Sequence, residues 1–317
     1  MNFLIAILMY ATWTSIFSLG KIALLHCPPI CLTSFRMLLA SVLILGYLAL
    51  FKKDLLKLKK KFLLPLMIYA IFSMYLTNAC EFWGLQHLSA AKTCFIYSLS
   101  PFFAALFSFI HFKEKMNTKK WIGMLIGFFG FLPVLFKQNG SSNLFSAFAI
   151  SLPELAIMGA ALFSVYGWVL LRLLVKEDAI SPLTVNGYSM LFGGFLALVH
   201  SFAIDSWTPT PISTTNYMSF FQSIIAMTLV SNVLCYNLYG YLLKRFTATL
   251  LSFIGLLSPI FASLNGWIFL GEKPSGIIFL STSIVIIGAW IIYKQELKQG
   301  YITKKPKKIS TKKLAST

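Results

Sequence analysis

Long apolar stretches, separated by short polar or lysine-rich segments, recur along the whole chain. They run for about 17 to 25 residues, the length at which a helix crosses roughly 30 Å of hydrocarbon. The runs are continuous and do not alternate between apolar and polar positions, so they predict helices and not the strands of a barrel. The pattern therefore predicts an all-α integral membrane protein with ten transmembrane helices, at residues 3–21, 30–51, 62–84, 89–112, 118–136, 154–175, 183–204, 217–242, 247–270 and 275–293.

The connections between these runs are short and leave no room for a soluble catalytic domain. The longest connection is rich in Asn, Gly and Ser and divides the chain into two halves with five runs each. We expect a first five-helix unit at 1–137, a linker at 138–153, a second five-helix unit at 154–293 and a basic cytoplasmic tail at 294–317.

Composition supports the membrane prediction. Hydrophobic residues make up 58% of the chain and charged residues only 11%, whereas soluble domains carry about a quarter charged residues. The net charge of +18 does not indicate nucleic-acid binding, because the basic residues stand in short segments beside the apolar runs. Eight lie between 294 and 313 and six between 52 and 61, where they suit anionic lipid headgroups.

The distribution of Lys and Arg predicts the orientation. If both termini are cytoplasmic, 22 of the 27 basic residues lie on the inside and five do not, which is a clear positive-inside bias. The first run lacks a charged segment before it, so we interpret it as a span and not as a cleaved signal peptide. We expect a multi-pass protein of a bacterial inner membrane.

An internal repeat is the most informative feature of the chain. At a shift of 158 residues, segment 85–132 aligns without gaps on 243–290, with fifteen identical positions. Because each half has an odd number of spans, five, the two halves must cross the membrane in opposite directions. Inverted repeats of this kind are typical of secondary transporters, whose substrate site lies where the halves meet. The identical pairs include Ser100 with Ser258, Pro101 with Pro259 and Glu114 with Glu272.

Each half carries Ser-Pro, an apolar run, Glu-Lys and a glycine-containing helix, and Arg36 stands early in the second run in the context SFRMLLA. This pattern resembles the EamA domains of the drug/metabolite transporter superfamily over nearly the whole chain. The resemblance implies a 5+5 inverted fold in which the first four helices of each half line a central cavity. Ser189 stands where the first half has Arg36, so the arginine is functional in at most one half.

Charges inside apolar runs are expensive and indicate functional sites. Arg36 is suited to bind a carboxylate bidentately, although a structural pairing with backbone carbonyls or an acid is an equal alternative. Glu81 and Lys92 stand near the predicted outer face. They are candidates for binding a zwitterionic substrate, for pairing with each other or for reaching the membrane interface, and Glu81 is also a candidate for binding a proton.

Polar and aromatic stripes add further substrate-binding candidates. Asn78 and Glu81 share one helical face, and the shift of 158 carries Met74, Asn78 and Glu81 onto Asn232, Tyr236 and Tyr239. The fourth run presents Tyr97 in a similar stripe. Trp13 can stack on a planar substrate or anchor its helix at the membrane boundary.

Pro101 and Pro259 each remove a backbone hydrogen bond from a predicted span, and we interpret them as gating positions, with packing as the alternative. The chain shows no phosphate-binding glycine motif, no paired carboxylates and no metal-ligand spacing among its five cysteines. We therefore expect neither an enzyme nor a protein with a cofactor or a metal.

These features predict a secondary transporter that moves a small zwitterionic or amphipathic metabolite by alternating access. Some members of the resembled superfamily in host-dependent bacteria are similar to S-adenosylmethionine importers. The excess of Lys over Arg, 24 to 3, suits such a source, so an S-adenosylmethionine-like or amino-acid-like substrate is expected. Two alternatives stay open: an exporter of amino acids or toxic compounds, and a non-transporting scaffold or lipid-binding protein. The expected partners are the substrate and membrane lipid, and a homodimer is neither required nor excluded.

Overall fold

Helices form all the regular structure in the part of the chain that the computed structural model describes. That part comprises residues 2–88, 90–139, 151–176, 180–207, 211–212, 217–258, 260–261 and 276–301. The α-helices are α1 (Asn2–Trp13), α2 (Ser15–Leu24), α3 (Pro29–Phe51), α4 (Leu63–Tyr69), α5 (Thr77–His87), α6 (Ala90–Tyr97), α7 (Ser100–Phe112), α8 (Thr118–Asn139), α9 (Leu152–Val175), α10 (Pro182–Ile204), α11 (Tyr217–Met227), α12 (Tyr236–Leu243), α13 (Ala248–Ile254) and α15 (Gly276–Lys298). Short 3₁₀ segments are η1 (Lys53–Leu56), η2 (Lys60–Phe62) and η8 (Gly255–Leu257), and π-helical segments are η3 (Ala70–Leu76) and η7 (Thr228–Cys235).

Six helical stretches of the described chain are long and apolar enough to cross a membrane. Two further helices, α8 with 22 residues and α15 with 23, have the length that a span requires. The helices agree with the prediction of an all-helical membrane protein. The six stretches are Phe3–Leu24, Pro29–Phe51, Lys60–His87, Leu152–Val175, Pro182–Ile204 and Tyr217–Leu243.

Local signals set several of the helix starts. Proline stands in the first turn of α3, α7, α9 and α10, where its missing N–H would have had no intrahelical partner. At the start of α9, the Ser151 backbone N–H donates to the Glu154 carboxylate at 2.5 Å. Glu154 is therefore a capping residue of this helix.

The polarity of the molecule is the reverse of that of a soluble protein. Large apolar side chains are exposed on the outside, such as Leu50 at 76% and Phe195 at 59%. Polar side chains are buried between the helices, among them Arg36 at 1% and Asn186 at 0%. Soluble monomers rarely expose large continuous apolar surfaces, so the outer faces of the bundle are suited to lipid.

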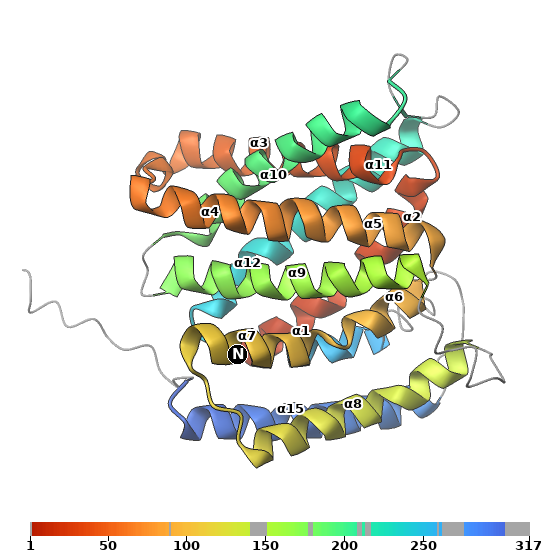
Figure 1. The fold of residues 1–317 in the computed structure, drawn as a ribbon, viewed down its shortest axis with the longest axis vertical. Coiled ribbons are helices and arrows are strands. Elements are labelled where there is room, and N and C mark those ends of the chain that lie inside the picture. Colours follow the sequence, from red (N-terminus) through yellow and green to blue (C-terminus); the bar gives the residue numbers. More distant parts are fainter. Residues whose placement is uncertain are drawn as a thin grey trace, which may run out of the picture.

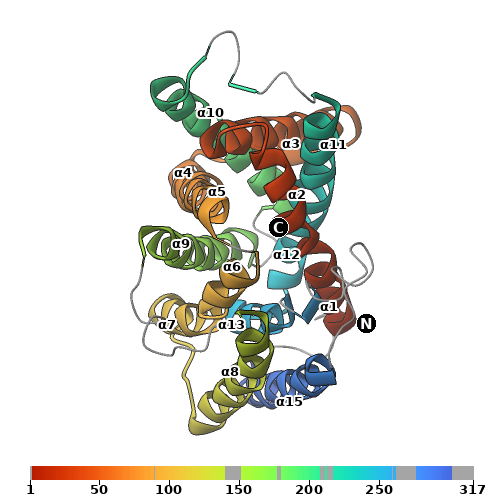
Figure 2. The ribbon, with the colours of Figure 1, turned by 90° about the vertical axis from the view of Figure 1, so that its right-hand side faces the viewer.

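The helices pair across the two halves of the chain. The closest pairs are α3 with α10 and α8 with α15, which lie at opposite ends of the molecule (Figure 1, Figure 2). Between them, α5 packs on α9, α2 on α11 and α7 on α13. Every one of these pairs joins one helix from before residue 140 to one from after residue 150, so the interface between the halves is also the core.

A chain of buried hydrogen bonds links helices of both halves. The Tyr69 hydroxyl of α4 donates to Asn186 Oδ1 of α10 at 3.0 Å, and Asn186 Nδ2 donates to Asn237 Oδ1 of α12 at 3.0 Å. Asn237 Nδ2 in turn donates to the Val233 carbonyl in η7 at 2.8 Å. Buried polar groups need such partners, so these hydrogen bonds fix the positions of α4, α10 and α12 relative to one another.

Interruptions of the helices occur at related places in the two halves. The π-helical segment η3 begins at Ala70 and η7 begins at Thr228, 158 residues later, which is the shift of the internal repeat. Each π segment leads directly into a short α-helix, α5 or α12. Further interruptions lie at Thr14 between α1 and α2 and between α6 and α7. Single π turns are frequent at functional sites.

The close approach of α8 and α15 depends on small residues. A Cβ atom added at Gly288 would lie 2.5 Å from the Gly123 carbonyl oxygen, while one added at Gly46 in α3 would meet no atom within 4 Å in the described structure. Gly288→Leu is expected to force the two helices apart, at a cost of about 1 to 3 kcal/mol, and to lower the Tm in detergent by several degrees.

Gly46→Leu is the matched control. It replaces a helical glycine that faces open space, and its Tm should be unchanged or slightly higher because glycine is a poor helix former. Equal losses of Tm in the two variants would show that the α8–α15 contact is not tightly packed.

Candidate functional site

A cavity lies inside the bundle where helices of both halves meet. Its lining residues belong to elements of both halves. The first half contributes α1, α2, α3, α5, α6 and α7, and the second half contributes α9, η7, α12, α13 and η8. Its empty space is about 880 Å³, including the part that is open to solvent.

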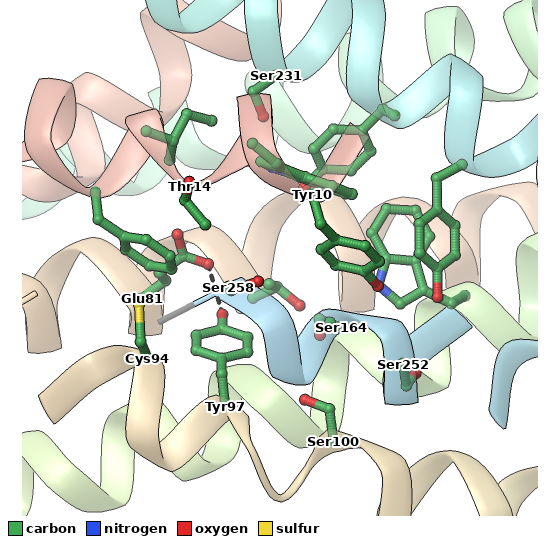
Figure 3. A pocket seen from close by; sticks show the side chains of 18 of the residues that line it. Tyr10, Thr14, Glu81, Cys94, Tyr97, Ser100, Ser164, Ser231, Ser252 and Ser258 are labelled. Carbon is green, nitrogen blue, oxygen red and sulfur yellow. Dashed lines mark hydrogen bonds between the residues drawn. The ribbon is translucent and has the colours of Figure 1, made fainter. Parts of the chain in front are cut away.

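One wall of the cavity carries its two charges. The Arg36 guanidinium donates to Asn78 Oδ1 and lies over the Phe82 ring, 4.7 Å from the ring centroid. The Tyr97 hydroxyl donates to Glu81 Oε2 at 2.5 Å (Figure 3). Within the described structure Arg36 Nε has no hydrogen-bond partner, so the guanidinium keeps a donor available to a ligand.

The π-helical segment positions this wall. In a π turn the carbonyls of successive residues lose their α-helical partners, and side chains can take their place. Asn78 Nδ2 donates to the Ser73 carbonyl at 3.0 Å and to the Met74 carbonyl at 3.1 Å, both in η3. These two bonds orient the amide so that Asn78 Oδ1 faces Arg36.

An aromatic cluster forms a second wall of the cavity. The rings of Trp168 and Tyr239 lie 4.2 Å apart at 33°, and Trp13 lies 5.3 Å from Tyr236 and 5.7 Å from Trp168. Tyr10 completes the cluster, 6.4 Å from the Tyr239 ring. Faces of such rings attract planar groups by stacking and cations through their quadrupole.

Small hydroxyl side chains lie around the rest of the cavity, several at helix interruptions. Thr14 lines it between α1 and α2, Ser100 at the start of α7 and Ser258 after η8 (Figure 3). Ser164 and Ser231 contribute from α9 and η7. In the part of the chain that the structure describes, no three His, Cys, Asp or Glu side chains gather to hold a metal ion.

Two buried ion pairs lie beyond the cavity, at the lysine-rich end of the bundle. Arg172, one turn after the cavity residue Trp168, donates to Glu114 at 2.5 Å. Lys120 lies 3.2 Å from Glu296, which also accepts a 2.6 Å hydrogen bond from Thr247. Both pairs join the first half of the chain to the second, so this end of the molecule is closed by contacts between the halves.

Seven of the predicted site residues line this cavity. Arg36, Asn78, Glu81 and Tyr97 lie on the charged wall. The two tyrosines of α12 and the tryptophan of α1 lie in the aromatic cluster, namely Tyr236, Tyr239 and Trp13.

Asn232, which was predicted to lie on the same stripe, is not among the residues that line the cavity. Asn232 is fully buried away from the cavity, and its Nδ2 lies 3.2 Å from the Met37 sulfur. The stripe was predicted with α-helical spacing, but η7 is π-helical and contains one more residue per turn. Ser231, five residues before Tyr236, consequently takes the cavity position.

Three candidates remain, and the structure fully describes one of them. Pro101 is buried in the first turn of α7, next to the cavity residue Ser100. The side chain of Lys92 in α6 and the whole of Pro259 lie outside the described residues.

The residues that sequence reasoning missed are mostly small. Ser252 and Gly255 line the cavity 158 residues after Cys94 and Tyr97, which also line it. The shift that relates Asn78 to Tyr236 would therefore have found them. For Tyr10, Thr14, Ser164 and Ser231 the sequence carries no comparable signal, because serine, threonine and tyrosine are common in apolar helices.

Comparison with known proteins follows the same division of the chain. The model of the EamA-like transporter family matches residues 1–136 and 151–294. A crystal structure of a protein with 16% sequence identity superposes with a TM-score of 0.72 over 93% of this chain and 97% of the other, which shows a shared fold.

Curated relatives are similar over nearly the full length. Two S-adenosylmethionine/S-adenosylhomocysteine transporters, from Chlamydia muridarum and Chlamydia trachomatis serovar L2, are each 38% identical over 292 residues. The match covers 92% of this chain, and 91% and 88% of those proteins. An uncharacterized transporter of Archaeoglobus fulgidus is 26% identical, with 88% of this chain and 92% of the relative covered.

The register of η7 can be tested by cysteine labelling. In a variant without the five native cysteines, Ser231→Cys should react several-fold faster with a small hydrophilic thiol reagent than Asn232→Cys, since only position 231 lines the cavity. Faster labelling at position 232 would mean that the segment is α-helical in the membrane.

Proposed function

The chain belongs to the EamA-like transporter family, and on this premise we propose that it carries an S-adenosylmethionine-like substrate through the central cavity. The family and the similar curated proteins are transporters and not enzymes, so the chain is a multi-pass membrane transporter with a small-molecule substrate. S-adenosylmethionine and S-adenosylhomocysteine are the substrates that the names of the Chlamydia relatives give.

The observation that carries this proposal is the division of the cavity into a charged wall and an aromatic wall. The amino-acid part of the substrate offers a carboxylate, which suits Arg36, and an ammonium group, which suits Glu81. The adenine is planar and suits the Trp168–Tyr239 pair. Ser164 and Ser252 are hydroxyl partners for the ribose between the two ends.

We infer a 5+5 inverted repeat for the fold, with one unit at 1–137 and the other at 154–293. The helix pairs support it, because an inverted repeat relates α3 to α10 and α8 to α15, and these are the two closest helix pairs. The cavity supports it as well, since its lining positions recur at a shift of 158 residues. The pairs are Asn78 with Tyr236, Glu81 with Tyr239, Cys94 with Ser252, Tyr97 with Gly255 and Ser100 with Ser258.

We place the protein in a bacterial inner membrane with both termini cytoplasmic. Two lysine-rich loops, between α3 and α4 and between α7 and α8, lie at the same end of the bundle (Figure 1). The two buried ion pairs also lie at that end. The conformation described here is then closed toward the cytoplasm, and the exposed apolar faces contact lipid.

Alternating access requires the cytoplasmic contacts to separate when the cavity opens inward. Arg172–Glu114 and Lys120–Glu296 each join the two halves, so both pairs must part if the halves move relative to one another. Removal of one partner of a buried ion pair destabilises the protein strongly, whereas the intact pair contributes little net stability. Such a pair suits a closure that has to open and form again.

The non-transporting scaffold predicted that Arg36, Asn78 and Tyr236 would face packed protein or lipid. All three line the cavity instead, which favours transport. The direction of transport is proposed as uptake, in keeping with the expectation of an S-adenosylmethionine importer.

Uptake and binding test the substrate proposal. Arg36→Ala should raise the Kd for S-adenosylmethionine at least about thirtyfold, since truncation of one partner of a buried charged hydrogen bond costs about 2 to 5 kcal/mol. Proteoliposome uptake of the labelled compound should fall accordingly. Arg36→Lys should give an intermediate loss because it keeps the charge without the planar fork.

Arg245→Ala is the matched arginine control, because Arg245 stacks over the Tyr241 ring outside the cavity lining. Unchanged binding in Arg36→Ala, with a normal elution profile and Tm, would remove the proposed binding mode. Absence of any uptake of S-adenosylmethionine by the unaltered protein would refute the proposed substrate.

The closure can be tested separately. Glu114→Gln leaves the Arg172 charge buried without its partner, which costs about 3 to 5 kcal/mol in the cytoplasm-closed state. A cysteine placed at Ser252 should then be labelled faster from the cytoplasmic side, and the exchange Glu114→Arg with Arg172→Glu should reverse the effect. A lower Tm with unchanged labelling would show that the pair only stabilises the fold.

A further inference from the structure

The described cavity lining contains one positive and one negative side chain. Arg36 and Glu81 are its only charged members, and no histidine accompanies them. Their charges sum to zero, and each is held by a neutral partner, Asn78 for the arginine and Tyr97 for the glutamate. Among the described residues, neither charge forms an ion pair with another side chain.

A substrate such as S-adenosylmethionine carries three charges at neutral pH. Its carboxylate and ammonium groups match Arg36 and Glu81, and this leaves the positive sulfonium without an anionic partner in the described lining. S-adenosylhomocysteine has the same two amino-acid charges and a neutral thioether. The two compounds thus differ in the sulfonium charge, and the described cavity lining offers no acidic side chain to balance it.

Aromatic rings stand where this charge would lie. Tyr236 and Trp13 line the same cavity as Arg36 and Glu81, and their two rings lie 5.3 Å apart. The sulfonium is joined to the amino-acid part by two methylene groups, which places it next to these rings when Arg36 and Glu81 hold the amino acid. Rings of Trp and Tyr attract such cations, with Trp as the stronger partner.

We propose that Trp13 and Tyr236 hold the sulfonium charge without an acidic side chain, so that exchange of S-adenosylmethionine for S-adenosylhomocysteine moves one net positive charge across the membrane. The inference rests on the proposed function and adds the mode of energy coupling. A potential that is negative inside then favours uptake of the sulfonium compound against release of the thioether, by about fiftyfold for 100 mV at equilibrium.

Proton transfer at Glu81 is the competing arrangement. If Glu81 bound a proton whenever the neutral thioether was carried, the proton would leave with it and the exchange would be electroneutral. The Tyr97 hydroxyl donates to Glu81 Oε2 at 2.5 Å, and Arg36 faces the same cavity. The two arrangements differ in their response to the membrane potential, because only the electrogenic exchange moves net charge.

The experiment uses the full chain in proteoliposomes under a potassium diffusion potential set with valinomycin. With S-adenosylhomocysteine inside, uptake of labelled S-adenosylmethionine should rise when the inside is negative, and its equilibrium accumulation should approach fiftyfold for 100 mV. With unlabelled S-adenosylmethionine inside, each cycle is electroneutral, so the accumulation of label should not respond to the potential.

The two exchanges separate the possible failures. Potential-independent exchange against S-adenosylhomocysteine, with working exchange of S-adenosylmethionine for itself, would overturn the inference and leave the transporter proposal standing. Absence of both exchanges would overturn the substrate proposal and the inference together.

Variants test where the sulfonium lies. Trp13→Leu should weaken binding of S-adenosylmethionine about tenfold more than binding of S-adenosylhomocysteine, and Trp13→Phe should retain most of the discrimination. Glu81→Gln should weaken both compounds by similar factors, because both carry the ammonium group. Trp290→Leu, at an exposed tryptophan of α15, is the control and should change neither. Equal losses for the two compounds in Trp13→Leu would overturn the assignment.

Discussion

The Arg36 guanidinium has to be solvated by the protein or by a ligand, because apolar helices shield it from water. It is 1% exposed, it donates to Asn78, and it lies over the Phe82 ring. Asn78 can accept this bond because its own amide nitrogen is held by two carbonyls of η3. The π turn thus positions Asn78, and Asn78 positions Arg36. The backbone irregularity of the third span therefore shapes the charged wall directly.

Charged side chains have different partners inside the cavity and beyond it. Beyond it, Arg172 pairs with Glu114 and Lys120 with Glu296, so these charges satisfy one another and join the halves. Inside it, Arg36 and Glu81 are each held by a neutral partner. The closure therefore keeps its charges within the protein, while the cavity leaves its charges available to a zwitterionic substrate.

The position of the cavity follows from the way the halves pack. Every major helix pair joins the first half to the second, and the lining residues come from both. A relative movement of the halves would alter the charged wall, the aromatic wall and the ion pairs together. This arrangement ties the binding of a substrate to the opening of one side or the other.

The sequence by itself determined the class of protein, the positions of the six long apolar helices and the residues of the charged wall. Hydrocarbon thickness and the cost of a buried charge act on local segments, so apolar runs and an arginine within one of them are legible without a structure. The tertiary structure decided the rest. Whether position 231 or 232 faces the cavity depends on the hydrogen-bond pattern of η7, which residue types do not specify. The partner of Glu114 is 58 residues away, at the end of a helix in the other half, and only the packing of the two halves brings the charges together.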